Sequence, residues 1–300
     1  MYKKLIYLTF FLLTITWHNS SYGAAPLQRG QRSNQQQLLT KKSTDVSKRT
    51  GTQLNSDRSH FYTLIAYKPT YIFPFYYTAT PYDAIYKNNT PRNQKLKKTE
   101  IKGQFSFQVP LISHFFSKKN SLNFAYTQVS FWQAYNKSPF FRESNYAPEL
   151  FLRSIINAKF TSKLGVIHQS NGRGTIYQRS WDRVYGETIF SGQSWMVSLE
   201  PWLRINESKA SDHNPDIQDY LGNGRILLVL KIGSNTLSLM TRNNMQSHFK
   251  RGAEKFTWSF PLNKHVRGVV EVFSGYGHSL IEYNHYTNTF AFGISFSDWM

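Results

Sequence analysis

The sequence predicts an all-β protein: a transmembrane antiparallel β-barrel of about twelve strands, preceded by a disordered N-terminal extension. Three observations lead to this fold. The first residues have the layout of a secretion signal, aromatic residues make up 16% of the 300 residues of the chain, and segments of alternating polar and apolar residues recur to its C-terminus. Aromatic residues gather where a barrel wall crosses the membrane–water interfaces.

Residues 1–24 are predicted to be a signal peptide. Lys3 and Lys4 form a short basic region, residues 5–17 form an apolar run, and small residues around Gly23–Ala25 offer a cleavage point. The apolar run is too short for a comfortable membrane span. The alternative is an uncleaved N-terminal anchor helix.

The next segment, residues 25–58, is polar and rich in Gln, Ser and Lys. It has too few large apolar side chains to bury a core, so we expect a flexible periplasmic extension. Residues 59–300 are expected to form one barrel domain, because strand and turn patterns continue without a linker or an internal repeat.

The chain has a net charge of +19 and contains no cysteine. Removal of the two signal-peptide lysines leaves 19 minus 2, or +17, which favours phosphate-bearing surfaces. An exported protein meets lipid more readily than nucleic acid, so no nucleic-acid partner is expected. The basic segment 87–98 is expected to be a solvated loop, or alternatively to rest against lipid phosphates. The lack of cysteine excludes disulfides and thiolate chemistry.

The clearest strand covers residues 101–109. Ile101, Phe105 and Phe107 share one face and Lys102 lies on the other, which indicates a strand with one apolar side. The same alternation occurs in residues 121–126, 195–205 and 288–300. About 240 residues, at roughly 20 per strand and connection, correspond to about twelve strands.

A histidine and a serine interrupt one of the apolar stripes. The stripe occupies every second position and consists of Leu164, Val166, His168 and Ser170. These residues therefore share a face of a strand. An apolar stripe on a barrel faces lipid, where a histidine and a serine have no packing role. A histidine can take the proton of a serine nucleophile if a third group orients its ring.

The following turn and strand could supply that third group. Residues 171–178 form the turn, and Asp182 lies 14 residues after His168, close enough for a hairpin to bring the two side by side. Gly172 has no side chain, so its amide could approach a developing oxyanion. Taken alone, these residues leave open an ordinary polar strand end.

The run HQSNGRG (168–174) followed by RSWDRVY (179–185) closely resembles the active-site hairpin of the outer membrane phospholipase A family. Residues 126–133, 138–152, 214–220 and 264–284 resemble further segments of that family, in the same order. The resemblance implies a twelve-stranded outer-membrane barrel with its site on the outer wall. It also implies Ser170 as nucleophile, His168 as base, Gly172 as oxyanion donor, and Asp182 at a position where well-known members have asparagine.

The same resemblance implies a calcium ion and a homodimer. Its ligands would be the carbonyl of Arg173, Gln178 where the family has serine, and Ser138 of the partner subunit. A second family site that uses two acids is expected to be lost, because Thr175 and His213 stand at those positions. Gln178 could instead be a plain loop residue.

Gln128 bears on dimerisation. It shares its face with Leu122, Phe124 and Tyr126, so it should face lipid, where an unpartnered amide costs several kcal/mol. Pairing with Gln128 of a second barrel would remove that cost, as the family resemblance implies. Alternatively, a bulge near Val129 turns Gln128 inward.

The sequence therefore predicts a bacterial outer-membrane phospholipase A1/A2. Calcium-assisted hydrolysis of phospholipid acyl esters would take place at the outer leaflet, activated by dimerisation. Two alternatives belong to other classes. One is a non-enzymatic channel or structural barrel, in which polar residues face the lumen. The other is a soluble exported β-protein that binds nucleic acid or polysaccharide.

Overall fold

The computed structural model describes residues 64–208, 210–244 and 247–299 of the chain. The predicted signal peptide and the predicted extension both lie outside these residues. The described part is almost entirely β-structure. Its strands are β1 Ile65–Ala66, β2 Tyr71–Thr78, β3 Thr99–Ser113, β4 Asn120–Trp132, β5 Phe141–Asn157, β6 Phe160–Ser170, β7 Ser180–Ser191, β8 Trp195–Ile205, β9 Gly224–Ile232, β10 Asn235–Arg242, β11 Ala253–Pro261, β12 Arg267–Tyr276 and β13 Tyr286–Ser295.

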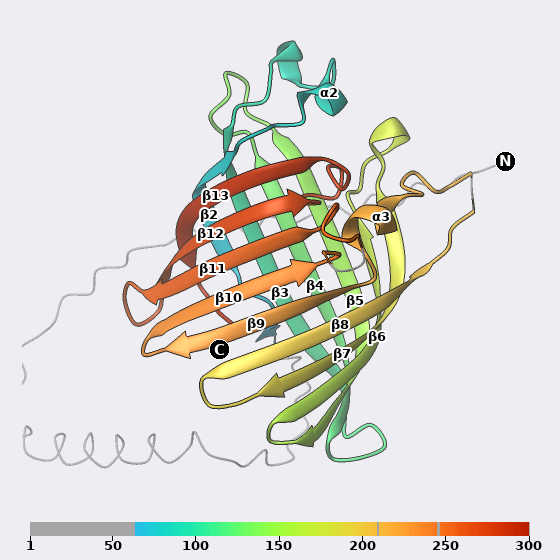
Figure 1. The fold of residues 1–300 in the computed structure, drawn as a ribbon, viewed down its shortest axis with the longest axis vertical. Coiled ribbons are helices and arrows are strands. Elements are labelled where there is room, and N and C mark those ends of the chain that lie inside the picture. Colours follow the sequence, from blue (N-terminus) through green and yellow to red (C-terminus); the bar gives the residue numbers. More distant parts are fainter. Residues whose placement is uncertain (1–63, 209, 245–246, 300) are drawn as a thin grey trace, which may run out of the picture. The chain divides into compact units, whose positions relative to one another are not determined.

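The strands form a closed antiparallel barrel (Figure 1). From β3 to β13 each strand pairs with the next, and β2 closes the ring by pairing with both β13 and β3. The two-residue β1 also pairs with β3, through Ile65 and Gln108, and so continues the line of β2. The wall therefore contains twelve strands, as the sequence predicted.

The wall is apolar outside and polar inside. On β3, Phe105 is exposed whereas Lys102 and Ser106 are buried; on β13, Phe290 and Phe292 are exposed. Lys102 reaches across the lumen to Glu271 on β12, with a Nζ–Oε1 distance of 2.7 Å. This arrangement confirms the alternation predicted for residues 101–109, and it is the pattern of a barrel in lipid.

The connections contain short helical turns. They are α2 Asp83–Tyr86, the 3₁₀ turns η1 Pro91–Asn93 and η2 Thr175–Tyr177, and α3 Ile217–Leu221. No helix of the described residues has the length and apolar character needed to span a bilayer. The basic segment 87–98 lies in the connection between β2 and β3, where Lys87, Arg92 and Lys98 are exposed.

Candidate active site on the outer wall

His168 and Asp182 lie directly opposite each other on the paired strands β6 and β7. Their side chains form a hydrogen bond of 2.7 Å between His168 Nδ1 and Asp182 Oδ1. Both side chains are nearly half exposed, at 46% and 42%. The hairpin thus brings together the histidine and the acid that the sequence separates by 14 positions.

The pair faces outward. Its neighbours in sequence, Ile167 and Gln169, line a cavity inside the barrel, so His168 between them projects from the opposite face. On that face the surrounding side chains are apolar and exposed: Leu164, Val166, Val184 and Leu203. The imidazole and the carboxylate therefore lie in a hydrocarbon-facing stripe.

Ser170 is two residues beyond His168 on the same strand and pairs with Ser180 of β7. Residues i and i+2 of a strand are about 6.6 Å apart along its axis, so a histidine ring can reach toward the serine hydroxyl. With Nδ1 occupied by Asp182, the ring nitrogen left for Ser170 is Nε2. The described structure records no hydrogen bond between the two side chains.

The loop after Ser170 holds Gly172 in a left-handed conformation, with φ of 62°. A Cβ atom at this position would lie 3.0 Å from Cε2 of Tyr146. Glycine is therefore required on two counts, the backbone angle and the neighbouring ring. Within the described residues, the Gly172 amide has no recorded acceptor, so it is free to donate.

Asn171 organises this loop, a role that the sequence analysis missed. Its Oδ1 accepts hydrogen bonds from the amides of Arg173 at 3.3 Å and Arg179 at 3.0 Å, and its Nδ2 donates to the carbonyl of Tyr177 at 2.8 Å. The side chain is buried. The Asn-Gly sequence was the available signal, because asparagine side chains commonly bond the backbone of the turn they begin.

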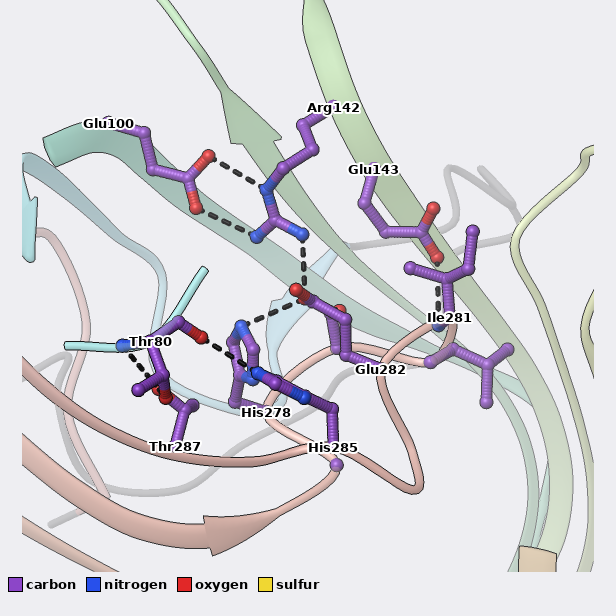
Figure 2. A network of polar contacts seen from close by, with 12 residues as sticks. Thr80, Glu100, Arg142, Glu143, His278, Ile281, Glu282, His285 and Thr287 are labelled. Atoms are coloured by element: carbon purple, nitrogen blue, oxygen red, sulfur yellow. Dashed lines mark hydrogen bonds and ion pairs between the residues drawn. The ribbon is translucent and has the colours of Figure 1, made fainter. Parts of the chain in front are cut away.

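A luminal ion-pair network, of which Figure 2 shows the part around Arg142 and Glu143, anchors the loop from inside the barrel. Arg173 Nε donates to buried Glu143 at 3.2 Å, and its guanidinium also donates to the carbonyl of Arg142. The other oxygen of Glu143 accepts from the amide of Ile281 at 3.2 Å. Glu143 therefore joins the loop after Ser170 to the loop between β12 and β13, and neither contact was foreseen from sequence.

The network continues through Arg142, which pairs with Glu100 at 2.7 Å and with Glu282 at 2.6 Å. His278 Nε2 lies 2.9 Å from Glu282, an ion-pair distance without hydrogen-bond geometry. Burial opposes ionisation of Glu282, but the Arg142 guanidinium, together with His278 and Ser279, outweighs it and lowers the pKa of that carboxyl well below its usual range. The carboxylate is thereby kept charged.

The phospholipase A1 family model matches residues 46–296 of the chain. A curated phospholipase A1 from Klebsiella pneumoniae is 31% identical over 253 residues, which cover 82% of this chain and 86% of the relative. The chain belongs to the phospholipase A1 family. The resemblance inferred from the hairpin is therefore confirmed, and so is its placement among phospholipases of the Gram-negative outer membrane. The channel and soluble-protein alternatives were wrong.

Two solved structures of this family superimpose on the barrel. The outer membrane phospholipase dimer of Salmonella typhi with bound calcium is 31% identical, with a TM-score of 0.73, and covers 81% of this chain and 95% of its own. An active-site mutant of the Escherichia coli outer membrane phospholipase A, in which an asparagine is replaced by alanine, gives the same identity and TM-score. It covers 82% of this chain and 96% of its own.

The three predicted calcium ligands of this phospholipase come from two connections, which adjoin where Phe140 and Tyr177 pack against one buried cluster. Arg173 and Gln178 belong to the loop after Ser170, whereas Ser138 lies between β4 and β5. The backbone of Ser138 is held by Gln94, whose Nε2 donates to its carbonyl at 2.5 Å and whose Oε1 accepts from its amide at 3.2 Å. No cluster of three or more His, Cys, Asp or Glu side chains suited to a metal is found among the described residues.

Gln128 lies on the outward face of β4. The register of β3 with β4 is continuous from Lys102–Phe131 to Pro110–Asn123, so the bulge considered near Val129 is absent. Gln128 Oε1 accepts from Tyr126 at 2.9 Å, and its Nε2 donates to Ser130 at 3.1 Å. The amide is thus partly satisfied within its own chain.

One further acid near the pair was not foreseen. Glu207 follows β8, whose last residue, Ile205, pairs with Asp182. Partial burial raises the pKa of the Glu207 carboxyl, and the Asp212 and Asp182 carboxylates add to the shift. Glu207 therefore lies within electrostatic range of the His168–Asp182 pair.

Proposed function

We propose that this enzyme hydrolyses phospholipid acyl esters at the outer leaflet, through Ser170, His168 and Asp182 on the outer wall of its barrel. The observation that carries the proposal is the 2.7 Å hydrogen bond from His168 to Asp182 in a lipid-facing stripe, with Ser170 two residues away. An ester bond of a membrane lipid lies beside such a stripe, whereas it would not reach a luminal site.

The geometry supports a serine-hydrolase mechanism. Asp182 accepts the Nδ1 proton, which fixes the neutral ring with Nε2 as its base. His168 takes the Ser170 proton as the hydroxyl oxygen attacks the acyl carbonyl, and then gives it to the departing lysolipid oxygen. In the second half of the reaction His168 takes a proton from water as the water oxygen attacks the acyl carbon. The bond from Ser170 to the acyl group then breaks, His168 returns the proton to Ser170, and the fatty acid is released. The Asp182 carboxylate stabilises the imidazolium formed in each step.

The oxyanion needs donors that are already in place. The amide of Gly172 has that role, since its left-handed backbone is fixed by the Asn171 contacts and it has no recorded internal acceptor. Arg173 braces the next residue of the loop against Glu143. These contacts keep the amide oriented before substrate arrives.

Calcium fits the neutral oxygens of this loop. The Arg173 carbonyl and the Gln178 side chain have no recorded partners in the described structure, and calcium prefers oxygen ligands of this kind. Ser138 of a second copy would complete the set, in keeping with the calcium-bound dimer of the Salmonella typhi relative. The ion would supply positive charge beside the oxyanion. The second family site would be absent, because Thr175 and His213 replace its acids.

Dimerisation through β4 would then control activity, because each site would be complete only with a second barrel. Gln128 can still offer one N–H and one lone pair beyond its contacts with Tyr126 and Ser130. Two such amides facing each other would satisfy both. Gln128→Leu should shift the enzyme toward monomers in chemical cross-linking. Leu122→Ala on the same face is the control, because it removes apolar contact area between the barrels but leaves the amide pair intact.

Phospholipid hydrolysis in detergent, with calcium or with a chelator, tests the proposed function. Ser170→Ala and His168→Ala should lose nearly all activity, Asp182→Asn should be tolerated, and the chelator should abolish hydrolysis. Ser180→Ala is the matched control, because this serine pairs with Ser170 across the hairpin. Full activity of Ser170→Ala would show that the nucleophile is another residue.

A further inference from the structure

A cavity of about 230 Å³ lies inside the barrel, on the inner face of the strands that carry the active site. Ile167, Gln169, Trp181 and Arg183 contribute to its wall from β6 and β7. It is therefore separate from the outer-wall site, which uses the alternate residues of the same strands. Its lining carries an excess of positive charge.

Basic side chains dominate the lining. Six basic residues face the cavity: Lys68, Lys102, Arg183, Arg225, Arg242 and Lys255. Glu200 is the single carboxylate in the lining. Three carboxylates pair with four of the six. The pairs are Lys68–Glu149 at 2.9 Å, Arg225–Glu200 at 2.5 Å, Lys102–Glu271 at 2.7 Å and Lys255–Glu271 at 3.8 Å. Six positive charges are thus matched by only three negative ones.

Arg183 and Arg242 have no carboxylate within 4 Å among the described residues. Arg183 Nη2 bonds to Gln169 at 3.0 Å, and its guanidinium stacks 3.9 Å from the ring centre of Trp181. Arg242 Nη2 bonds to the carbonyls of Tyr276 and Gly277 at 2.7 and 2.6 Å. These neutral partners satisfy hydrogen bonds but do not balance charge.

Each of the two guanidinium groups also keeps an unused donor. The Nε atoms of Arg183 and Arg242 are buried and have no hydrogen-bond partner within the part of the chain that the structure describes. Arg183 as a whole is only 8% exposed. A buried donor without an acceptor is costly, and a buried cation without an anion is costlier.

We propose that the lumen contains a binding site for a small multivalent oxyanion of the inorganic phosphate class, held by Arg183, Arg242 and Lys255. A tetrahedral oxyanion offers several acceptors and matches the planar donor geometry of arginine. At about 30 Å³ for each water, the cavity has room for such an ion with part of its hydration.

Thermal unfolding of the full-length enzyme in a phosphate-free detergent tests this site. At equal ionic strength and pH, inorganic phosphate should raise the melting temperature above its value in chloride, and the rise should saturate. Arg242→Met should abolish this response, whatever its own melting temperature in chloride, because it removes a guanidinium from the proposed site. Arg92→Gln, an exposed arginine in the loop between β2 and β3, should respond as wild type does.

Lys255→Met provides a second measurement if Arg242→Met does not fold, and it should weaken the phosphate response. Equal melting temperatures of the wild type in phosphate and chloride would overturn the proposal. A response that survives in both luminal variants would do the same, as would stabilisation by phosphatidylglycerol micelles without any by inorganic phosphate. These outcomes do not depend on the Ser170 mechanism.

Discussion

Gly172→Ala tests the oxyanion assignment with a single methyl group. The new Cβ would lie 3.0 Å from the Tyr146 ring, on a residue with φ of 62°. The left-handed backbone costs a non-glycine residue about 1–2 kcal/mol, which the folded barrel can tolerate. Relief of the clash should tilt the 172 amide away from the oxyanion. Loss of one such donor lowers kcat by about 100- to 1,000-fold.

Gly174→Ala is the matched control in the same loop. Gly174 has extended backbone angles, φ −107° and ψ 175°, and a Cβ there would meet nothing within 4 Å. The assay is phospholipid hydrolysis under saturating substrate, with heat-modifiable gel mobility as the check on folding. If the Gly172 variant matches the Gly174 variant in kcat while both are folded, the amide of Gly172 does not stabilise the transition state.

Three further predictions concern the network behind the loop. Arg142→Gln should destabilise the barrel by about 3–5 kcal/mol in urea unfolding, because Glu100 and Glu282 would lose their buried partner. The pKa of Glu282 is lowered in the folded state, so its contribution to the free energy of unfolding is complete above the carboxyl pKa of the unfolded chain and should be lost as the pH falls. Urea midpoints should therefore decline across the acid range. The decline should be smaller in Arg142→Gln, which lacks the cation that lowers this pKa. Glu143→Gln should lower activity and raise the calcium concentration needed for half-maximal rate, because Arg173 would lose its ion pair. An unchanged calcium dependence would show that the Arg173–Glu143 ion pair does not position the calcium ligands.

Local patterns predicted the hairpin well. The two-residue spacing of His168 and Ser170 fixed their common face, and the loop length placed Asp182 opposite His168. Both inferences needed only the strand period and one turn. The same reasoning could not decide whether Gln128 faced outward, because Phe131 and Val129 are apolar luminal residues that imitate a lipid-facing stripe.

The remaining contacts were beyond sequence reasoning because they join distant segments. Glu143 and Ile281 are 138 residues apart, and no period relates them. The charge imbalance of the lumen was equally hidden. Arg183 and Arg242 look like ordinary alternating polar residues until the barrel closes and shows which carboxylates lie nearby.

With the proposed catalytic pair His168 and Ser170 facing outward, the plane of the bilayer would be the enzyme's reaction medium. Substrate would arrive by lateral diffusion, so turnover would follow the mole fraction of cleavable lipid among its neighbours and not the amount per volume of buffer. Diluting the bilayer with an inert, uncleavable lipid would slow the enzyme even when total substrate is unchanged.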